Sequence, residues 1–118
     1  LLIGGGSGHE PLWGGFLGTG FADAVVCGDI FAAPGPVAIL DTIREADQGL
    51  GVVIVHCNYA GDNMNFQIAA EMAAAEGIKT PIINKENIEI DKKISGAIYF
   101  ISIISNYLRA RCLLISEL

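Results

Sequence analysis

Two side chains with acid–base chemistry, His9 and Asp62, stand at equivalent places in the sequence. Each follows a short apolar run and precedes a stretch with helical character. An imidazole exchanges a proton near neutral pH, which suits a general base, and a carboxyl group can serve as its acid partner. Taken alone, each residue has a plainer explanation. A lone histidine is more often structural or exposed, and an aspartate before a helix is more often an N-cap worth about 1 kcal/mol.

A glycine-rich run, residues 4–8, leads directly into His9. Consecutive glycines after a strand allow backbone N–H groups to surround an oxygen-rich ligand. The run lacks the Gly-Lys-Ser/Thr sequence of a P-loop, and His9 and Pro11 stand where a dinucleotide fingerprint requires glycine. The pattern therefore predicts a loop that approaches a ligand closely without being a nucleotide cradle. A tight turn between a strand and a helix explains it equally well.

These residues are embedded in alternating apolar runs and helical stretches, which predict an α/β fold with a mainly parallel sheet built from βαβ units. Strands are expected at residues 1–3, 24–27, 51–57 and 78–83, and helices at 37–46 and 63–76. The glycine run would be a loop, and Asp62 or Asn63 would cap the second helix. Because the carboxyl ends of parallel strands share one edge, where ligands bind, His9 and Asp62 are expected to face one small molecule.

The remaining pattern is less informative. We expect His56 to lie within its strand as a core or sheet-surface residue, and Met64 and Phe66 to be packing residues. After residue 84 the pattern degrades, although a strand near residues 97–103 is expected. The first residue continues a strand rather than being an initiator methionine, which suggests a fragment.

The composition excludes several classes of protein. The 118 residues allow one small domain, and a hydrophobic fraction of 52% with only 17% charged residues excludes disorder. A net charge of −6 argues against nucleic-acid binding. Three widely spaced cysteines form neither a disulfide framework nor a metal site, so a reduced, cytoplasmic setting is expected. The longest apolar run, residues 97–104, is too short to span a membrane.

Three motifs, in this order and spacing, resemble the dihydroxyacetone (glycerone) kinase family, in its substrate-binding DhaK subunit or domain. They are GGGSGHEP (residues 4–11), VVCGDIFAAP (25–34) and NYAGDNMNF (58–66). The resemblance covers residues 1–80 well, whereas residues 81–118 are degenerate. It implies that the chain is an incomplete DhaK-like α/β domain.

The resemblance also implies a function. Family members phosphorylate dihydroxyacetone or a related short ketose on a terminal hydroxyl. The chain itself would bind no cofactor, because ATP-Mg or a nucleotide recharged by a phosphoenolpyruvate relay belongs to a DhaL-type partner subunit or domain. A homodimer is expected. By carry-over, His9 is the proton acceptor and Asp62 its acid partner, and the substrate-binding residues are Gly6, Ser7, Gly8, His9, Cys57 and Asp62.

Two departures from the family pattern matter. Cys57 stands where the family often has a lysine, which is closer to kinases of four-carbon ketoses such as erythrulose. The family also holds its substrate covalently through a second histidine, and here the only histidines are His9 and His56. The chain alone is therefore expected to be inactive. A non-catalytic ketose-binding or regulatory remnant, or a degenerate gene product, remains an alternative.

Overall fold

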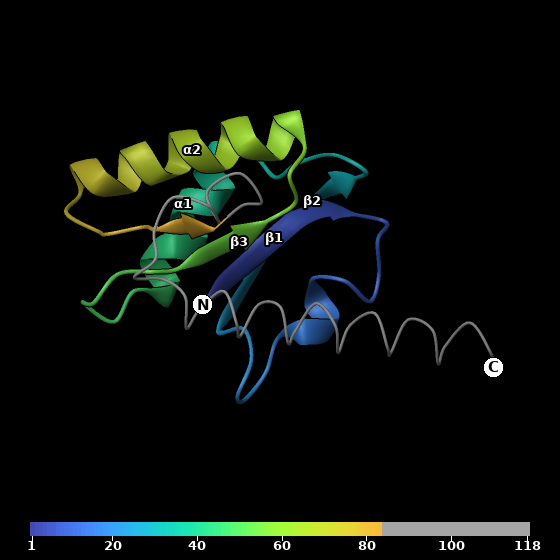
Figure 1. The fold of residues 1–118 in the computed structure, drawn as a ribbon, viewed down its shortest axis with the longest axis horizontal. Helices are drawn as coiled ribbons and strands as arrows, with labels where there is room; N and C mark the ends of the chain where they lie inside the picture. The colour runs from blue at the N-terminus through green and yellow to red at the C-terminus, as the bar shows by residue number, and fades with distance from the viewer. Residues whose placement is uncertain (84–118) are drawn as a thin grey trace. The chain divides into compact units, whose positions relative to one another are not determined.

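A computed structural model describes residues 1–83. Four parallel strands form one sheet in the order β2-β1-β3-β4, and this confirms the predicted α/β class (Figure 1). The elements along the chain are β1 (Leu2–Ser7), the 3-10 turn η1 (Gly14–Phe16), β2 (Ala24–Ile30), α1 (Pro36–Ala46), β3 (Ile54–His56), α2 (Ala60–Ala75) and β4 (Ile82–Ile83).

Helices α1 and α2 cover one face of the sheet. Their apolar side chains pack with inward residues of β1, β2 and β3 in one core, in which Leu2, Ile39, Ile54 and Phe66 are fully buried. The segment that carries η1 lies against the opposite face, where Ile3, Trp13 and Ala22 form a second, smaller core (Figure 1). Alternate residues of β1 thus feed opposite cores, as the twofold period of a strand requires.

Strand β1 continues through the glycine run, contrary to the loop expected there. Glycine is depleted in strands, so the sequence pattern ends the strand too early. The structure requires glycine at these positions for space. A Cβ on Gly4 would lie 2.6 Å from Val26 atoms, and one on Gly5 would lie 2.6 Å from the Trp13 ring. The missing side chains let β2 and the Trp13 indole approach the backbone of β1 closely.

Other boundaries also differ from expectation. Strand β2 continues to Ile30, and β3 is shorter than residues 51–57. Strand β4 comprises Ile82–Ile83 instead of beginning at residue 78, and α2 begins at Ala60 with Tyr59 as its N-cap. The N-cap prediction for Asp62 is therefore wrong, because Asp62 lies in the first turn of the helix. Met64 is 60% exposed and is not the packing residue expected, whereas Phe66 is fully buried.

The expected strand near residues 97–103 lies outside the described residues, as does most of the 81–118 region. Within residues 1–83, no helix has the length and apolar character needed to cross a membrane.

Candidate functional site

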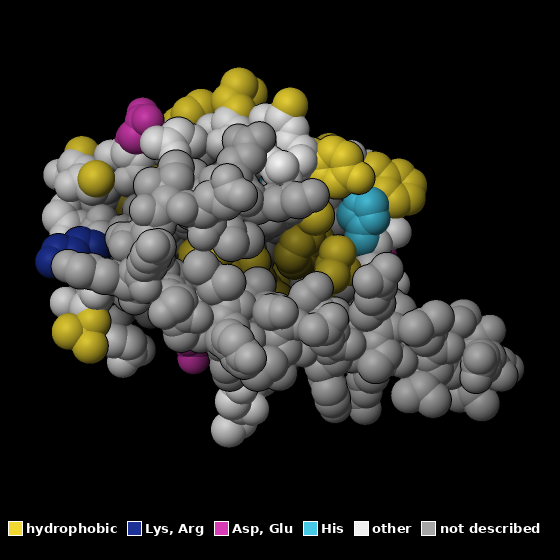
Figure 2. All heavy atoms as spheres, viewed as in Figure 1, with side chains coloured by type: hydrophobic (Ala, Val, Ile, Leu, Met, Phe, Trp, Pro, Cys, Tyr) yellow, Lys and Arg dark blue, Asp and Glu magenta, His cyan; other side chains and the backbone are white. Residues whose placement is uncertain are grey.

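A cavity of about 340 Å³ opens at the carboxyl ends of β1, β2 and β3. Its lining residues come from the end of β1, from the connections that follow the three strands and from the first turn of α2: Gly6, His9, Phe31, Ala33, Cys57, Tyr59, Gly61 and Asp62. His9 and Asp62, which are distant in sequence, thus line one space, as the strand topology predicts. A histidine side chain is visible at the surface, flanked by hydrophobic side chains (Figure 2).

Asp62 is the buried acid of this cavity. Its residue is only 6% exposed, and its Oδ1 atom has no hydrogen-bond partner among the described residues. Burial raises the pKa of Asp62 above its ordinary value, and the nearby His56 and His9 oppose this rise. An unsatisfied buried carboxyl oxygen in a cavity wall is suited to accept a hydrogen bond from a ligand hydroxyl.

His9 lies on the exposed side of the cavity, in a loop held by short-range contacts. The N–H of Gly8 donates to both carboxylate oxygens of Glu10 at 3.1 and 3.0 Å. The carbonyl of His9 accepts a hydrogen bond from the N–H of Leu12 at 3.0 Å. The imidazole meets the ring of Phe31 edge to face, with 5.1 Å between ring centroids. The loop is therefore braced on both sides of the histidine.

Ser7 and Gly8, two of the predicted substrate-binding residues, are not among the residues that line the cavity. The hydroxyl of Ser7 donates to the carbonyl of Gly28 at 2.6 Å and so joins β1 to β2. Gly6 does line the cavity, and its carbonyl accepts a hydrogen bond from the Trp13 indole at 3.2 Å. Ser7 thus links β1 to β2, and Gly8 stabilises the loop through its hydrogen bonds to Glu10.

Cys57 lies at the end of β3, in the cavity wall and half-buried. Burial raises the pKa of its thiol, and the negative charge of Asp62 adds to this rise. The thiol is therefore protonated and neutral at pH 7. Unlike a lysine, it brings no positive charge to the cavity.

His56 is a core residue, as expected. It is 7% exposed, and its ring stacks on Phe66 with 4.6 Å between centroids. Its Nδ1 lies 2.7 Å from the carbonyl oxygen of Cys57, so this nitrogen carries the proton and donates. His56 does not line the cavity, but it lies close enough to Asp62 to oppose the rise in the pKa of that carboxyl group.

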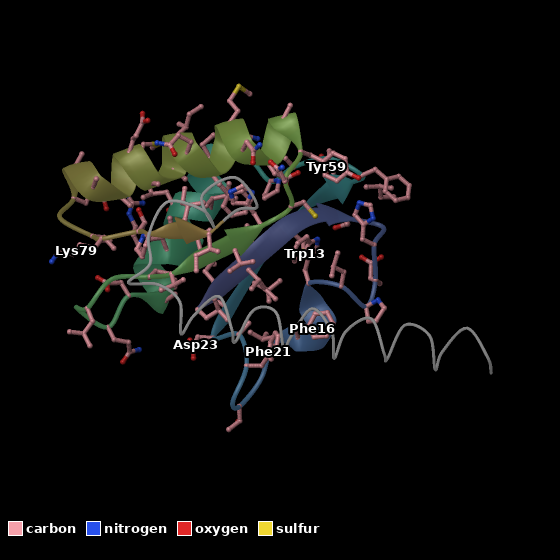
Figure 3. The ribbon with its side chains drawn as sticks, viewed as in Figure 1. Trp13, Phe16, Phe21, Asp23, Tyr59 and Lys79 are labelled. Atoms are coloured by element: carbon pink, nitrogen blue, oxygen red, sulfur yellow. The ribbon has the colours of Figure 1, made fainter. Side chains whose placement is uncertain are left out.

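The sequence did not point to Phe31, Ala33, Tyr59 and Gly61 as site residues. All four lie within the motifs around residues 25–34 and 58–66, and their position just after a strand was the available signal. Tyr59 is 70% exposed at the start of α2, whereas Trp13 belongs to the core on the other face of the sheet (Figure 3). Tyr59 and Trp13 thus lie in different places, Tyr59 at the cavity and Trp13 in the second core.

The charge of the cavity limits what it can hold. Its lining contains one carboxyl group and no lysine or arginine. Within residues 1–83, no cluster of three or more histidine, cysteine, aspartate or glutamate side chains could hold a metal ion. The described lining therefore has no permanently cationic side chain to pair with a phosphate group. It offers the imidazole of His9 and the carboxyl group of Asp62 to the hydroxyl groups of a small ligand.

Comparison with known proteins shows the family to which the chain belongs. The chain is 47% identical over 95 residues to the dihydroxyacetone-binding subunit DhaK of a PTS-dependent dihydroxyacetone kinase from Listeria innocua, an alignment that covers 80% of this chain and 27% of the relative. It therefore spans about a quarter of that relative's length.

Two solved structures are also similar, each with a TM-score of 0.68 over 70% of this chain. One is the dihydroxyacetone kinase of C. freundii in complex with AMP-PNP and Mg²⁺, at 43% identity and 15% of its length. The other is a dihydroxyacetone kinase operon co-activator, DhaQ, at 39% identity and 25% of its length. The Dak1 domain model matches residues 1–95. The chain belongs to the Dak1 domain family.

Proposed function

We propose that this chain is the ketose-binding part of a dihydroxyacetone (glycerone) kinase. The observation that carries the proposal is the cavity at the carboxyl edge of the sheet, where His9 and Asp62 face one small space. Its volume of about 340 Å³ accommodates a three- or four-carbon ketose. Its lack of a lysine or arginine favours an uncharged ligand over a phosphorylated one.

In this proposal His9 removes the proton from a terminal hydroxyl of the ketose as that oxygen attacks the phosphoryl group. Asp62 forms a hydrogen bond near the carbonyl group of the ketose, as donor or acceptor, and so orients the ketose in the cavity. The carboxyl group accepts a hydrogen bond when it is ionised and can also donate one when it is protonated, and burial raises the pKa of Asp62 in the direction of the protonated form. Phosphoryl transfer depends mainly on positioning, which a preformed cavity supplies.

The phosphoryl donor belongs to a partner in this proposal. A bound nucleotide would supply the phosphoryl group. The cavity lining includes no lysine or arginine, and the described residues contain no group of three or more potential metal ligands. We therefore assign ATP-Mg, or a relay-charged nucleotide, to a DhaL-type subunit or domain that closes over the cavity. A homodimer of the ketose-binding part completes the proposed assembly.

Cys57 is proposed to affect which ketose is accepted. Its neutral, half-buried thiol leaves the wall of the cavity without a positive charge next to Asp62. A lysine at this position would pair with Asp62 and narrow the space. The cysteine therefore favours a longer, four-carbon ketose over dihydroxyacetone.

A second candidate function is ketose binding without catalysis, in a regulatory protein. The similarity to the operon co-activator DhaQ supports it, with the same TM-score as the kinase. The histidine content supports it too, because His56 packs on Phe66 and leaves His9 as the one histidine that lines the cavity. A covalent anchor for the ketose would have to come from outside this chain.

An amide NMR titration of the chain with dihydroxyacetone and with erythrulose tests the proposal. We expect saturable shifts at Gly6, His9 and Asp62, and much weaker shifts in Asp62→Ala. Asp29→Ala, at an exposed carboxyl outside the cavity, is the matched control and should bind as the wild type does. Absence of saturable shifts with either ketose would contradict both candidate functions.

Turnover then separates the two candidates. The chain is mixed with a nucleotide-binding partner subunit, ATP and the ketose, and the ketose phosphate is measured. Ketose phosphate that disappears in His9→Ala supports the kinase. Saturable ketose binding without phosphorylation, in the presence of a partner that is active with another DhaK subunit, supports the regulatory protein.

A further inference from the structure

Phe31 has an unusual backbone conformation at the mouth of the cavity. Its φ angle is +55°, and it is the only non-glycine residue with a positive φ in the described part of the chain. A bulky residue in the left-handed region costs free energy, because its Cβ crowds the backbone. The ring gains little from burial in return, because Phe31 is 70% exposed. Such outliers concentrate at functional sites.

Phe31 contacts the end of β1 and the loop that carries His9. Its N–H donates to the carbonyl of Ser7 at 2.7 Å, which joins the end of β2 to the end of β1. Its ring lies so close to Gly8 that a Cβ added there would be 2.8 Å from the ring. The same ring meets the imidazole of His9 at 5.1 Å between centroids, with 65° between the ring planes.

The backbone around Phe31 is fixed from both sides. The N–H of Ala32 donates to the carbonyl of Asp29 at 3.0 Å and closes a turn around the residue. Asn65 of α2 donates its side-chain amide to the carbonyl of Pro34 at 2.9 Å. The left-handed conformation is thus held in place by its surroundings, and it directs the ring toward His9 and away from the core.

We propose that Phe31 is a positioning residue for His9. The ring covers the backbone of Gly8 and restricts the imidazole to orientations that face the cavity. This inference rests on the proposed function only in naming a ketose hydroxyl as the group that His9 meets. Phe31 lines the cavity beside His9, but its hydrocarbon ring takes no part in proton transfer.

Three variants separate the ring from the backbone. Phe31→Tyr keeps an aromatic ring, and Phe31→Leu removes it while keeping an apolar side chain. Phe31→Gly removes the side chain at a φ angle that glycine adopts freely, so this variant folds even if the leucine variant does not. Ile30→Ala is the matched control, because Ile30 directly precedes Phe31 at the end of β2, is 74% exposed and does not line the cavity.

The first readout is side-chain NMR of the two histidines in the full 118-residue chain. In the wild type and Phe31→Tyr we expect ring-to-ring nuclear Overhauser effects at His9 and slow internal motion of its ring. In the leucine and glycine variants, the His9 resonances should lose the ring-current shift that the Phe31 ring produces, and the imidazole should relax as a freely rotating ring. The His56 resonances should not change in any variant, which shows that the core is intact.

The second readout is turnover with the nucleotide-binding partner. We expect about a tenfold loss of kcat with less than a threefold change in KM in Phe31→Gly, because a misplaced base slows the reaction more than it weakens binding. Phe31→Tyr and Ile30→Ala should retain activity.

A His9 ring that is already freely rotating in the wild type would overturn the proposal, as would full kcat in a folded Phe31→Gly. If the wild type has no turnover, the proposed kinase function fails. The histidine spectra still decide whether Phe31 positions His9.

Discussion

Replacing Asp62 by asparagine should stabilise the fold while weakening ligand binding. The carboxyl group is 6% exposed and its Oδ1 atom has no hydrogen-bond partner in the described part of the chain. An unsatisfied buried polar group costs about 1–3 kcal/mol, and a charged one costs more. The first turn of α2 offsets this by about 0.3–1 kcal/mol, because a helix N-terminus favours a negative charge. An asparagine keeps the shape without the charge, so we expect a gain of about 1 kcal/mol at pH 7.

The pH dependence of this gain follows from the direction of the pKa shift. Burial raises the pKa of Asp62 in the folded state above the value of 3.8 that is usual for an aspartate. The folded state therefore binds the Asp62 proton more tightly than the unfolded state does. The contribution of Asp62 to stability is fully present below the unfolded pKa and is lost as the pH rises through the folded pKa. The advantage of Asp62→Asn should accordingly vanish at low pH and be complete at neutral pH.

Urea unfolding of the wild type and Asp62→Asn, measured at a series of pH values from about 3 to 7, checks this expectation. Asp29→Asn removes a charge at an exposed position and serves as the control. A variant less stable than the wild type at pH 7 would show that the carboxylate has a partner that satisfies it. A difference that does not change with pH would refute the assignment to the buried charge. Ketose affinity should fall in the same variant.

Three further outcomes are expected. Gly4→Ala should destabilise the protein by about 1–3 kcal/mol in urea unfolding, because its Cβ would lie 2.6 Å from a carbonyl oxygen of β2, whereas Gly14→Ala meets no atom within 4 Å and should be nearly neutral. Ser7→Ala should lose about 1 kcal/mol of stability, because the Ser7 hydroxyl donates a hydrogen bond to the carbonyl of Gly28. If Ser7→Ala loses as much ketose affinity as a His9 variant does, this structural role is contradicted. Phe66→Ala should cost about 3–5 kcal/mol, since the ring is fully buried, and a loss under 1 kcal/mol would refute its place in the core.

The sequence predicted the features that depend on periodicity. Alternating apolar runs and helical stretches predict the parallel sheet, and parallel topology places His9 and Asp62 at one edge of it. The exact ends of elements were harder to predict. Gly4 and Gly5 have low strand propensity. The close approach of the Val26 and Trp13 side chains explains why glycine is required at these positions of β1.

Other features depend on tertiary contacts that no local pattern carries. The start of α2 at Ala60 makes Asp62 a first-turn residue rather than a cap, and this places its carboxyl group in the cavity wall. The motif at residues 25–34 is indicated by the family resemblance alone. In the structure its Phe31 adopts a left-handed backbone conformation, and its ring contacts the imidazole of His9. An aromatic residue with such a role has no sequence signal of its own, because phenylalanine is equally common as a buried core residue.

The three consecutive glycines of β1, Gly4 to Gly6, limit which substitutions this chain can accept during evolution. Every single-base change in a glycine codon that alters the residue adds a side chain, and at Gly4, Gly5 and Gly6 even the smallest addition would meet atoms within 3 Å. Selection should therefore purge almost all variation at these three codons. At Gly14 and Gly35, by contrast, an added Cβ meets no atom within 4 Å and the backbone φ is negative. A mutational scan of the chain should find low tolerance from Gly4 to Gly6, and also at Gly28, where an added Cβ would lie 2.2 Å from the carbonyl oxygen of Ala32.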